Sequence, residues 1–134
     1  MRAHAATALG TVLIDLEGDD AVLVDDDPPS AAITDVSLPL LVAADQVGAR
    51  IVAVVARRPP LVLSDDAGQT WREAGGGLPA GTAIAIDPDD PDLLLFASES
   101  RLFLSEDGGR FWRALGPELI GITALAFSER LDVA

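Results

Sequence analysis

Short apolar runs alternate along this chain with turns rich in Gly, Pro and Asp. Thr82–Ile86 alternates between the two faces of an extended segment, which is typical of a β-strand. The run Leu93–Ser98 is continuously apolar and of strand length, so we expect its side chains to be buried on both faces of a sheet. Arg101–Leu104 and Phe111–Leu115 complete a predicted unit of four strands, a to d, joined by hairpin turns.

The unit recurs upstream and downstream. A second complete copy has predicted strands at 40–44, 51–56, 61–63 and 70–72. A degenerate copy before it has strands b, c and d at 11–16, 21–24 and 31–34, with Asp25–Asp27 standing where its last turn should be. After the second copy, 122–127 is another strand a, and 131–134 could begin a strand b. No stretch of helix length shows helical spacing with caps, so we predict an all-β fold.

These boundaries divide the chain into a flexible N-terminus and one repeat module. The N-terminus covers residues 1–9, and the module covers 10–134. Within the module, 10–39 is the degenerate unit, 40–80 and 81–121 are complete units, and 122–134 supplies a strand that completes another unit.

An eight-residue motif, S-x-D-x-G-x-x-W, marks the turn between strands c and d in both complete units. It spans Ser64–Trp71 and Ser105–Trp112, an offset of 41 residues (64 to 105). A fixed period of this size indicates supersecondary units that stack on one another. The Ser and Asp oxygens can accept hydrogen bonds from backbone N–H groups of a tight turn, the Gly can adopt a positive φ, and the Trp covers apolar surface. We assign structural roles to Ser64, Asp66, Gly68, Trp71, Ser105, Asp107, Gly109 and Trp112.

The motif, preceded by an apolar strand and an Asp-Pro turn, resembles the Asp-box (BNR) repeats of β-propellers. Such repeats occur in sialidases, sortilin-type receptors and photosystem II assembly-factor-like proteins. The resemblance covers residues 40–127 and is closest at Ile84–Asp92 and Arg101–Ser105. It implies β-propeller-like, four-stranded blades, about three in this chain. Because enzymes and non-enzymes share the repeat, it implies no particular activity.

Three blades are fewer than the roughly 4–8 of a closed propeller. Two chains could exchange the strand at 122–127 with the incomplete first unit and form a homodimeric, six-bladed ring. Alternatively, the chain is part of a longer propeller, cut within a strand at Ala134. The sequence leaves both possibilities open.

Composition narrows the choice of partners. The chain has 22 acidic and nine basic residues and a net charge of −13, so it would repel nucleic-acid phosphates and anionic lipid.

No segment approaches the ~18 apolar residues needed to span a membrane. The absence of Cys excludes disulfides and thiolate chemistry. Without a clear signal peptide we expect a cytoplasmic protein, while secretion stays open.

Hairpin connectivity predicts two ends of the molecule with opposite charge. The a–b and c–d turns at one end carry the carboxylates Asp65, Asp66, Asp87, Asp89, Asp90, Asp92, Glu106 and Asp107. Arg57, Arg58 and Arg101 fall at the other end, near Gly75–Gly77, and by family analogy this end binds ligands. We hypothesise that the three arginines accept a carboxylate of a protein or sugar. The alternative is that they are ordinary surface arginines.

We assign no catalytic residue, metal site or cofactor. The prolines of Asp87–Asp92 favour a plain turn over a Ca²⁺ loop, and their spacing does not match an EF-hand. His4, the single histidine, falls in the expected frayed terminus, and the chain has no Tyr to act as a sialidase nucleophile. We therefore expect a non-enzymatic scaffold or binding module that recognises a protein or glycan. The alternative is a glycoside-hydrolase-like fragment whose catalytic residues lie outside this chain.

Overall fold

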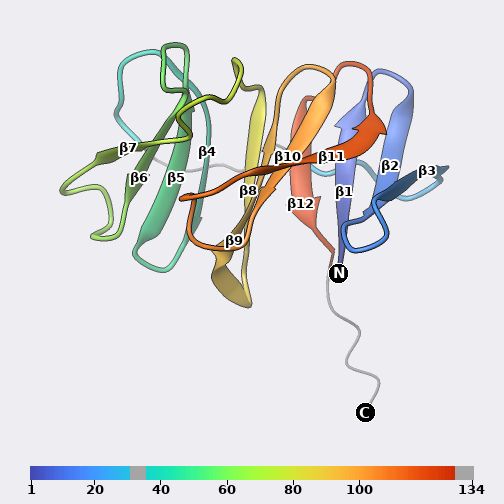
Figure 1. Ribbon diagram of the computed structural model, residues 1–134, viewed down its shortest axis with the longest axis horizontal. Helices are drawn as coiled ribbons and strands as arrows, with labels where there is room; N and C mark the ends of the chain where they lie inside the picture. Colours follow the sequence, from blue (N-terminus) through green and yellow to red (C-terminus); the bar gives the residue numbers. More distant parts are fainter. Residues whose placement is uncertain (31–35, 129–134) are drawn as a thin grey trace.

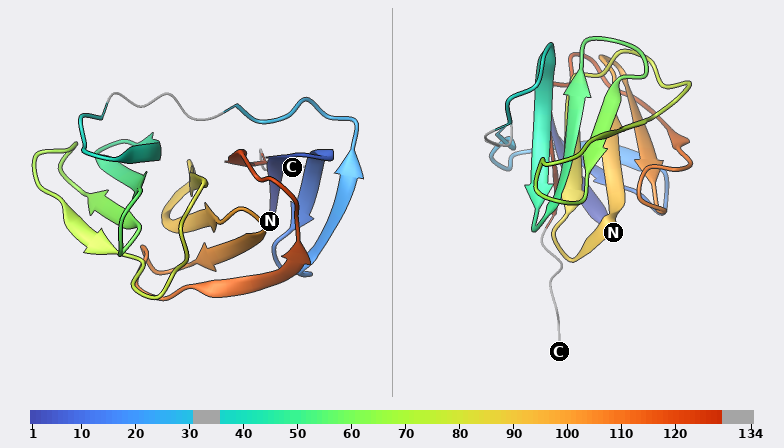
Figure 2. Two further views of the ribbon diagram at one scale, coloured as in Figure 1. Left: turned by 90° about the horizontal axis from the view of Figure 1, so that it is seen from above. Right: turned by 90° about the vertical axis from the view of Figure 1, so that its left-hand side faces the viewer.

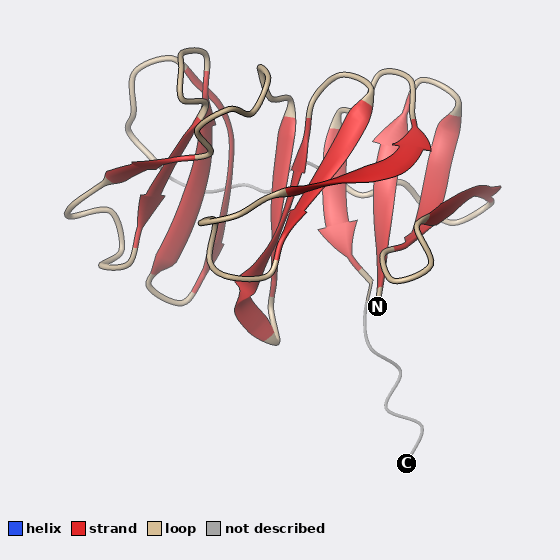
Figure 3. Ribbon diagram, viewed as in Figure 1, coloured by secondary structure: helices blue, strands red, loops and turns tan. Residues whose placement is uncertain are grey.

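The computed structural model describes residues 1–30 and 36–128, and within these ranges it contains strands and loops but no helix (Figure 3). The twelve strands are β1 (Arg2–Thr7), β2 (Gly10–Asp15), β3 (Asp20–Val24), β4 (Leu41–Val47), β5 (Arg50–Val55), β6 (Leu61–Ser64), β7 (Arg72–Ala74), β8 (Ala83–Asp87), β9 (Asp90–Ala97), β10 (Arg101–Ser105), β11 (Arg113–Glu118) and β12 (Ala124–Phe127).

The strands form three antiparallel sheets of four strands each. Sheet I has the order β12-β1-β2-β3, sheet II the order β4-β5-β6-β7, and sheet III the order β8-β9-β10-β11. Sheets II and III each use four consecutive strands, as hairpin turns dictate. The predicted all-β architecture of repeated four-stranded units is therefore confirmed.

Sheet I joins the two ends of the described chain. Strand β12 pairs with β1, with Ala3 opposite Phe127 and Ala6 opposite Ala124. The prediction of a flexible N-terminus at residues 1–9 is wrong, because Ala3 and Ala5 are fully buried. The alanine-rich segment has little apolar bulk, which is why its sequence did not indicate a strand. The strand exchange considered above is also not what the structure shows, since β12 completes sheet I within its own chain.

The strands predicted for the degenerate unit are shifted by one place. Segments 11–16 and 21–24 form β2 and β3, which are the third and fourth strands of sheet I rather than its second and third. The turn between them is closed by Asp15, whose Oδ1 accepts hydrogen bonds from the N–H groups of Glu17 (3.2 Å) and Gly18 (3.1 Å). Asp25–Asp27 instead follow β3. The strands predicted at 31–34 and 131–134 lie outside the described residues.

The two complete units contain all of their predicted strands, with two differences. Strand d begins later than predicted, at Arg72 in β7 and Arg113 in β11, so both motif tryptophans precede it. In addition, β9 begins at Asp90, so the acidic segment predicted as a turn contributes three residues to this strand. The apolar part of β9 is buried on both faces as expected, with Leu93, Leu95 and Ala97 toward sheet I and Leu94 and Phe96 toward sheet II.

Sheet III lies between sheets I and II and shares a hydrophobic core with each (Figures 1 and 2). Strand β8 contacts β4 on one side and β12 on the other, so the inner strands of the three sheets are neighbours. The view from above shows the sheets fanning out from these strands as an open arc (Figure 2). The chain between β3 and β4 starts at one terminal sheet of the arc and ends at the other.

The turns that join the strands gather at two opposite ends of the molecule, above and below the sheets in Figure 1, as hairpin connectivity predicted. The upper end carries the β1–β2, β5–β6 and β9–β10 turns and the β7–β8 and β11–β12 connections. The lower end carries the remaining turns and the carboxylates that flank them. The structure thus separates the predicted ligand-binding end from the acidic end.

Candidate functional site

In the first motif, side-chain oxygens bind the backbone of the β6–β7 turn. Ser64 Oγ accepts hydrogen bonds from the N–H of Gly68 (2.8 Å) and Asp66 (3.3 Å), and donates to Asp66 Oδ1 (2.7 Å). The Asp66 carboxylate accepts from the N–H (2.8 Å) and the hydroxyl (2.5 Å) of Thr70. Gly68 has φ +92°, where a β-carbon would be strained.

The second motif repeats this arrangement in the β10–β11 turn. Ser105 Oγ accepts from the N–H of Gly109 (2.9 Å), whose φ is also +92°, and donates to Asp107 Oδ1 (2.9 Å). Asp107 Oδ1 further accepts from the N–H of Phe111 (3.0 Å). Trp112 Nε1 donates to the Gly109 carbonyl (3.0 Å), which fixes the indole against the turn. Both motifs have the turn geometry that their residue types predicted.

Hydrogen bonding keeps both motif carboxylates ionised. The hydroxyl and N–H of Thr70, with Ser64, lower the pKa of Asp66 to about 2. The N–H of Phe111 similarly lowers the pKa of Asp107. A general acid near neutral pH needs a pKa raised toward 7, so these shifts oppose that role. The two carboxylates act as turn acceptors.

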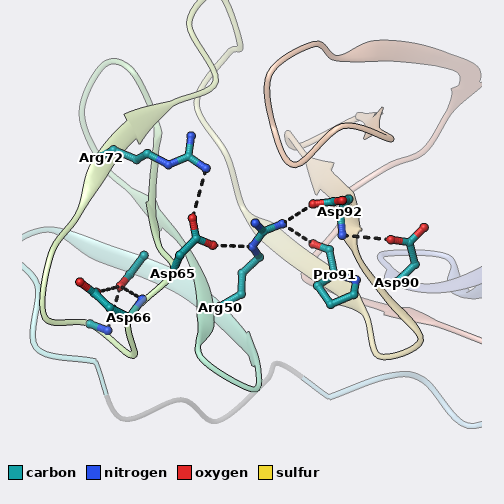
Figure 4. Close-up of polar contacts among 9 residues, drawn as sticks. Arg50, Asp65, Asp66, Arg72, Asp90, Pro91 and Asp92 are labelled. Carbon is teal, nitrogen blue, oxygen red and sulfur yellow. Dashed lines mark hydrogen bonds and ion pairs between the residues drawn. The ribbon is translucent and has the colours of Figure 1, made fainter.

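Arg50 was not identified from the sequence, although it connects two sheets (Figure 4). It is the first residue of β5, and its side chain is 18% exposed. Nε donates to Asp65 Oδ1 (2.8 Å) in sheet II, while Nη1 donates to Asp92 Oδ1 and the Pro91 carbonyl (2.8 Å each) in sheet III. Burial alone would lower the pKa of Arg50, but Asp65 and Asp92 outweigh it and raise the pKa. No sequence signal distinguishes this arginine from the others.

Two carboxylates make similar connections between sheets. Asp45 Oδ2, on β4, accepts from the N–H of Ile86 on β8 (2.8 Å), and Asp19 Oδ1 accepts from the N–H of Gly116 on β11 (2.7 Å). Burial raises the pKa of Asp45, partly offset by its bonds to Ile86 and Gln46. A carboxylate with a raised pKa is a candidate general acid, yet its contacts show that Asp45 joins sheets II and III.

The structure places the three predicted ligand-binding arginines at the upper end, in adjacent sheets. Arg57 and Arg58 lie exposed in the β5–β6 turn, and neither forms an ion pair with any described residue. Arg101 begins β10, and its Nη2 contacts Glu118 Oε1 at 3.1 Å. At this end Arg101 is therefore paired with Glu118, whereas Arg57 and Arg58 have no ion-pair partner among the described residues.

The upper end also carries an apolar hollow that the sequence did not indicate. It has a volume of about 160 Å³ and lies where the β1–β2 turn approaches the β11–β12 connection. Leu9, Leu23 and Ile120, each 60–67% exposed, line it together with Thr7, Val12, Ala21, Val22, Glu118 and Leu119. Exposed apolar side chains gathered around a hollow are typical of interaction surfaces.

His4 lies on β1 rather than in a frayed terminus. Its Nε2 contacts Asp26 Oδ2 (2.9 Å), and its Nδ1 contacts Ser128 Oγ (2.8 Å). In a Ser-His-Asp hydrolase the serine contacts Nε2 and the aspartate Nδ1, so the nitrogens here have the opposite partners. The contacts hold the chain after β3 and the end of β12 against β1. We assign no catalytic role to them.

The acidic segment before and within β9 uses its carboxylates to bind the local backbone. Asp87 Oδ1 accepts from the N–H of Asp89 (2.9 Å), and Asp90 Oδ1 accepts from that of Asp92 (3.2 Å). In the parts of the chain that the structure describes, no group of three or more His, Cys, Asp or Glu side chains is arranged to hold a metal ion. Nor does any helix there have the length and apolarity to cross a membrane.

A scan against protein-family models found no match, and searches of curated proteins and of solved structures found none either. The resemblance to Asp-box repeats therefore stays a prediction from the motif and its spacing.

Proposed function

We propose that this chain is a non-enzymatic binding module of β-propeller type, which recognises a protein or glycan at its upper end. The observation that carries the proposal is the exposed cationic charge of Arg57 and Arg58, which no described residue pairs, in a protein of net charge −13. An exposed guanidinium pair can hold a carboxylate by bidentate hydrogen bonds. We accordingly favour an acidic partner, either a peptide or an acidic sugar.

The apolar hollow on the same end supports this proposal. Arg57 and Arg58, in sheet II, would anchor an anionic group of the ligand. The apolar surface around Leu9 and Ile120 lies beyond sheet III, so an extended ligand that crosses the upper end of sheet III would gain contact area there that does not depend on charge. The acidic lower end would repel the same ligand, so charge would also orient it. The motif residues contribute indirectly, because they fix the turns of the scaffold.

Binding of acidic ligands tests the proposal. A solid-phase assay first determines whether the parent protein binds immobilised sialylated glycans or poly-Glu peptide. The double variant Arg57→Glu/Arg58→Glu should lose that binding. The matched control is Arg110→Glu/Arg113→Glu at the lower end, which changes the net charge equally and should retain most binding. Equal losses would show that only overall charge matters, and unchanged binding in the first variant would exclude these arginines.

The enzymatic alternative is tested separately with fluorogenic glycosides. A scaffold should release no fluorophore above background. Turnover that a single carboxylate substitution abolishes would contradict the proposal and place a glycoside-hydrolase site within this chain.

A further inference from the structure

Strand β3 forms one edge of sheet I, and no described residue pairs with its outer side. It lies at the outer margin of the arc, beyond β2 (Figure 2). Apart from the pairing with β2, Asp20–Val24 makes no backbone-to-backbone hydrogen bond with a described residue. Alternate residues of an antiparallel strand direct their N–H and C=O groups away from a given neighbour. Strand β3 therefore presents donors and acceptors along a free edge.

The outer strands of the other two sheets are protected against further pairing. Strand β7 has three residues, two of them charged, and β11 carries Arg113, Pro117 and Glu118. Short length, charge and proline all discourage the addition of a strand at an edge. Strand β3 has five residues, of which one is charged, and it exposes Val22 by 54% and Leu23 by 60%. Its edge lacks the protection of the equivalent strands.

On the face toward sheet III, the edge of β3 borders the apolar hollow. Val12 packs toward sheet III, and the register places Leu23 opposite Val12 on the same face. Leu23 lines the hollow with Leu9 and Ile120, and each of these three side chains is 60–67% exposed. A side chain that reached past the edge on this face would meet apolar surface.

On the opposite face, the edge of β3 borders a polar hollow. The register places Val22 opposite Leu13 on this face. The hollow has a volume of about 190 Å³ and is lined by Arg2, Leu13, Asp15, Asp20, Ala21 and Val22. Two of these side chains are carboxylates and one is a cation. The two hollows share Ala21 and Val22, so they flank the same stretch of β3.

Contacts at both ends of β3 hold this edge in place. Before the strand, Asp19 Oδ1 accepts from the N–H of Gly116 on β11 (2.7 Å). After the strand, Asp26 Oδ2 contacts His4 Nε2 on β1 (2.9 Å), so the chain that follows β3 covers the part of the sheet over β1. The edge itself stays accessible at Val22 and, because its ends are fixed, can bind a strand without being ordered first.

We propose that β3 binds an extended peptide segment of a partner protein, which becomes a fifth strand of sheet I. Backbone hydrogen bonds to the free edge hold the segment, and its side chains alternate between the apolar and the polar hollow. This site is separate from the one proposed above, because it requires neither Arg57 nor Arg58.

The two hollows define the chemistry of the segment. Side chains on the face toward sheet III are apolar, as the surroundings of Leu23 require. Side chains on the opposite face are basic, because Asp15 and Asp20 outnumber Arg2 in the polar hollow. The net charge of −13 attracts such a segment from a distance.

A synthetic peptide and two matched variants test the proposal. The probe is a fluorescein-labelled peptide of about eight alternating lysine and valine residues, enough to span a strand of ordinary length. Fluorescence anisotropy should show saturable binding to the parent protein. Val22→Lys places an ammonium at the edge and should weaken binding about tenfold, because it repels the lysines of the peptide. The control Val42→Lys makes the same change at a valine of β4 that is 48% exposed, and should leave binding unchanged.

N-methylated peptides test strand pairing without changing the protein. The N–H groups of alternate residues in a bound strand face the edge. Methylation of the backbone nitrogens of all lysines or of all valines should therefore abolish binding in one of the two peptides and largely preserve it in the other. Equal effects of the two methylations would exclude pairing with an edge and overturn the proposal.

Three further results would overturn the proposal. The first is a parent protein that does not bind the alternating peptide at about millimolar concentration. The second is equal binding of a peptide in which all lysines precede all valines, since charge alone would then explain the affinity. The third is an equal loss in Val22→Lys and Val42→Lys. The variant Arg57→Glu/Arg58→Glu should bind the alternating peptide at least as well as the parent, which distinguishes this site from the arginine pair. A loss of binding in that variant would place the peptide elsewhere than at β3.

Discussion

At the residue scale, the motif side chains are defined by the hydrogen bonds that they accept. Within one turn, the Ser64 and Asp66 side chains accept hydrogen bonds from three backbone N–H groups and from the hydroxyl of Thr70. Truncating either side chain therefore leaves donors unsatisfied. This explains why acidic residues occur in the motif of a protein that already has an excess of negative charge. The carboxylate fixes the turn, and its ionised form is the better acceptor.

The Asp66 contacts predict a loss of stability in acid. The pKa of Asp66 is about 2 in the folded protein against 3.8 as the reference value, so the unfolded chain binds the proton more readily between these pH values. The stabilisation is present above about pH 4 and is lost as pH falls toward 2. Urea unfolding at several pH values gives the free energy of unfolding. As pH falls toward 2, this free energy should decrease less for Asp66→Asn than for the parent.

The control is Asp27→Asn, which removes one exposed carboxylate outside any strand. Its free energy of unfolding should decrease in acid by as much as that of the parent. If the decrease is reduced equally in both variants, overall charge rather than the motif turn governs the loss of stability in acid.

At the element scale, the two motif tryptophans cover equivalent faces of neighbouring sheets. Trp112 lies in the core shared by sheets II and III, where its ring is 6.0 Å from that of Phe96 and inclined at 66°. Trp71 occupies the same motif position on sheet II, where it packs, with Val36 and Leu38, on a cluster of small buried residues. The same residue type thus serves a contact between two sheets in one case, and a face covered by the segment before β4 in the other.

Removing the Trp112 ring should destabilise the fold without affecting ligand binding. Trp112→Ala deletes its contacts in the core and its bond to Gly109, which should cost about 3 kcal/mol and lower the melting temperature by roughly 10 °C. The neighbouring Phe111 is 79% exposed. Phe111→Ala should therefore change stability by no more than about 0.5 kcal/mol.

Differential scanning fluorimetry measures both variants, and the solid-phase assay measures binding at the upper end. A large effect of Phe111→Ala, or a loss of binding with an unchanged melting temperature in Trp112→Ala, would mean that this motif contributes to a ligand site.

The sequence predicted the elements of sheets II and III because each carries a motif and alternating apolar strands. It did not predict β1, because Arg2–Thr7 depends on close packing of small alanines rather than on apolar bulk. The separation of Arg57 and Arg58 from the carboxylates followed from hairpin connectivity. The pairing of Arg101 with Glu118, and the position of Arg50 between two sheets, depend on distances between turns that no local pattern specifies.

At the scale of the whole molecule, charge is distributed unevenly in a protein of net charge −13. The lower end collects carboxylates from all three sheets, while Arg57 and Arg58 lie exposed at the upper end. An acidic ligand would be attracted by this arginine pair and repelled by the lower end. Both interactions are electrostatic, so their strength can be changed by salt.

Added salt should therefore weaken the binding of an acidic ligand at the upper end. The screening length falls from about 10 Å at 0.1 M to about 3 Å at 1 M ionic strength, and an exposed guanidinium is strongly screened from a carboxylate under these conditions. The solid-phase assay across a NaCl series should show a dissociation constant that increases as salt rises. In Arg57→Glu/Arg58→Glu any residual binding should depend less on salt. Binding that salt leaves unchanged would show that apolar contacts rather than the arginine pair hold the ligand, contrary to the proposal.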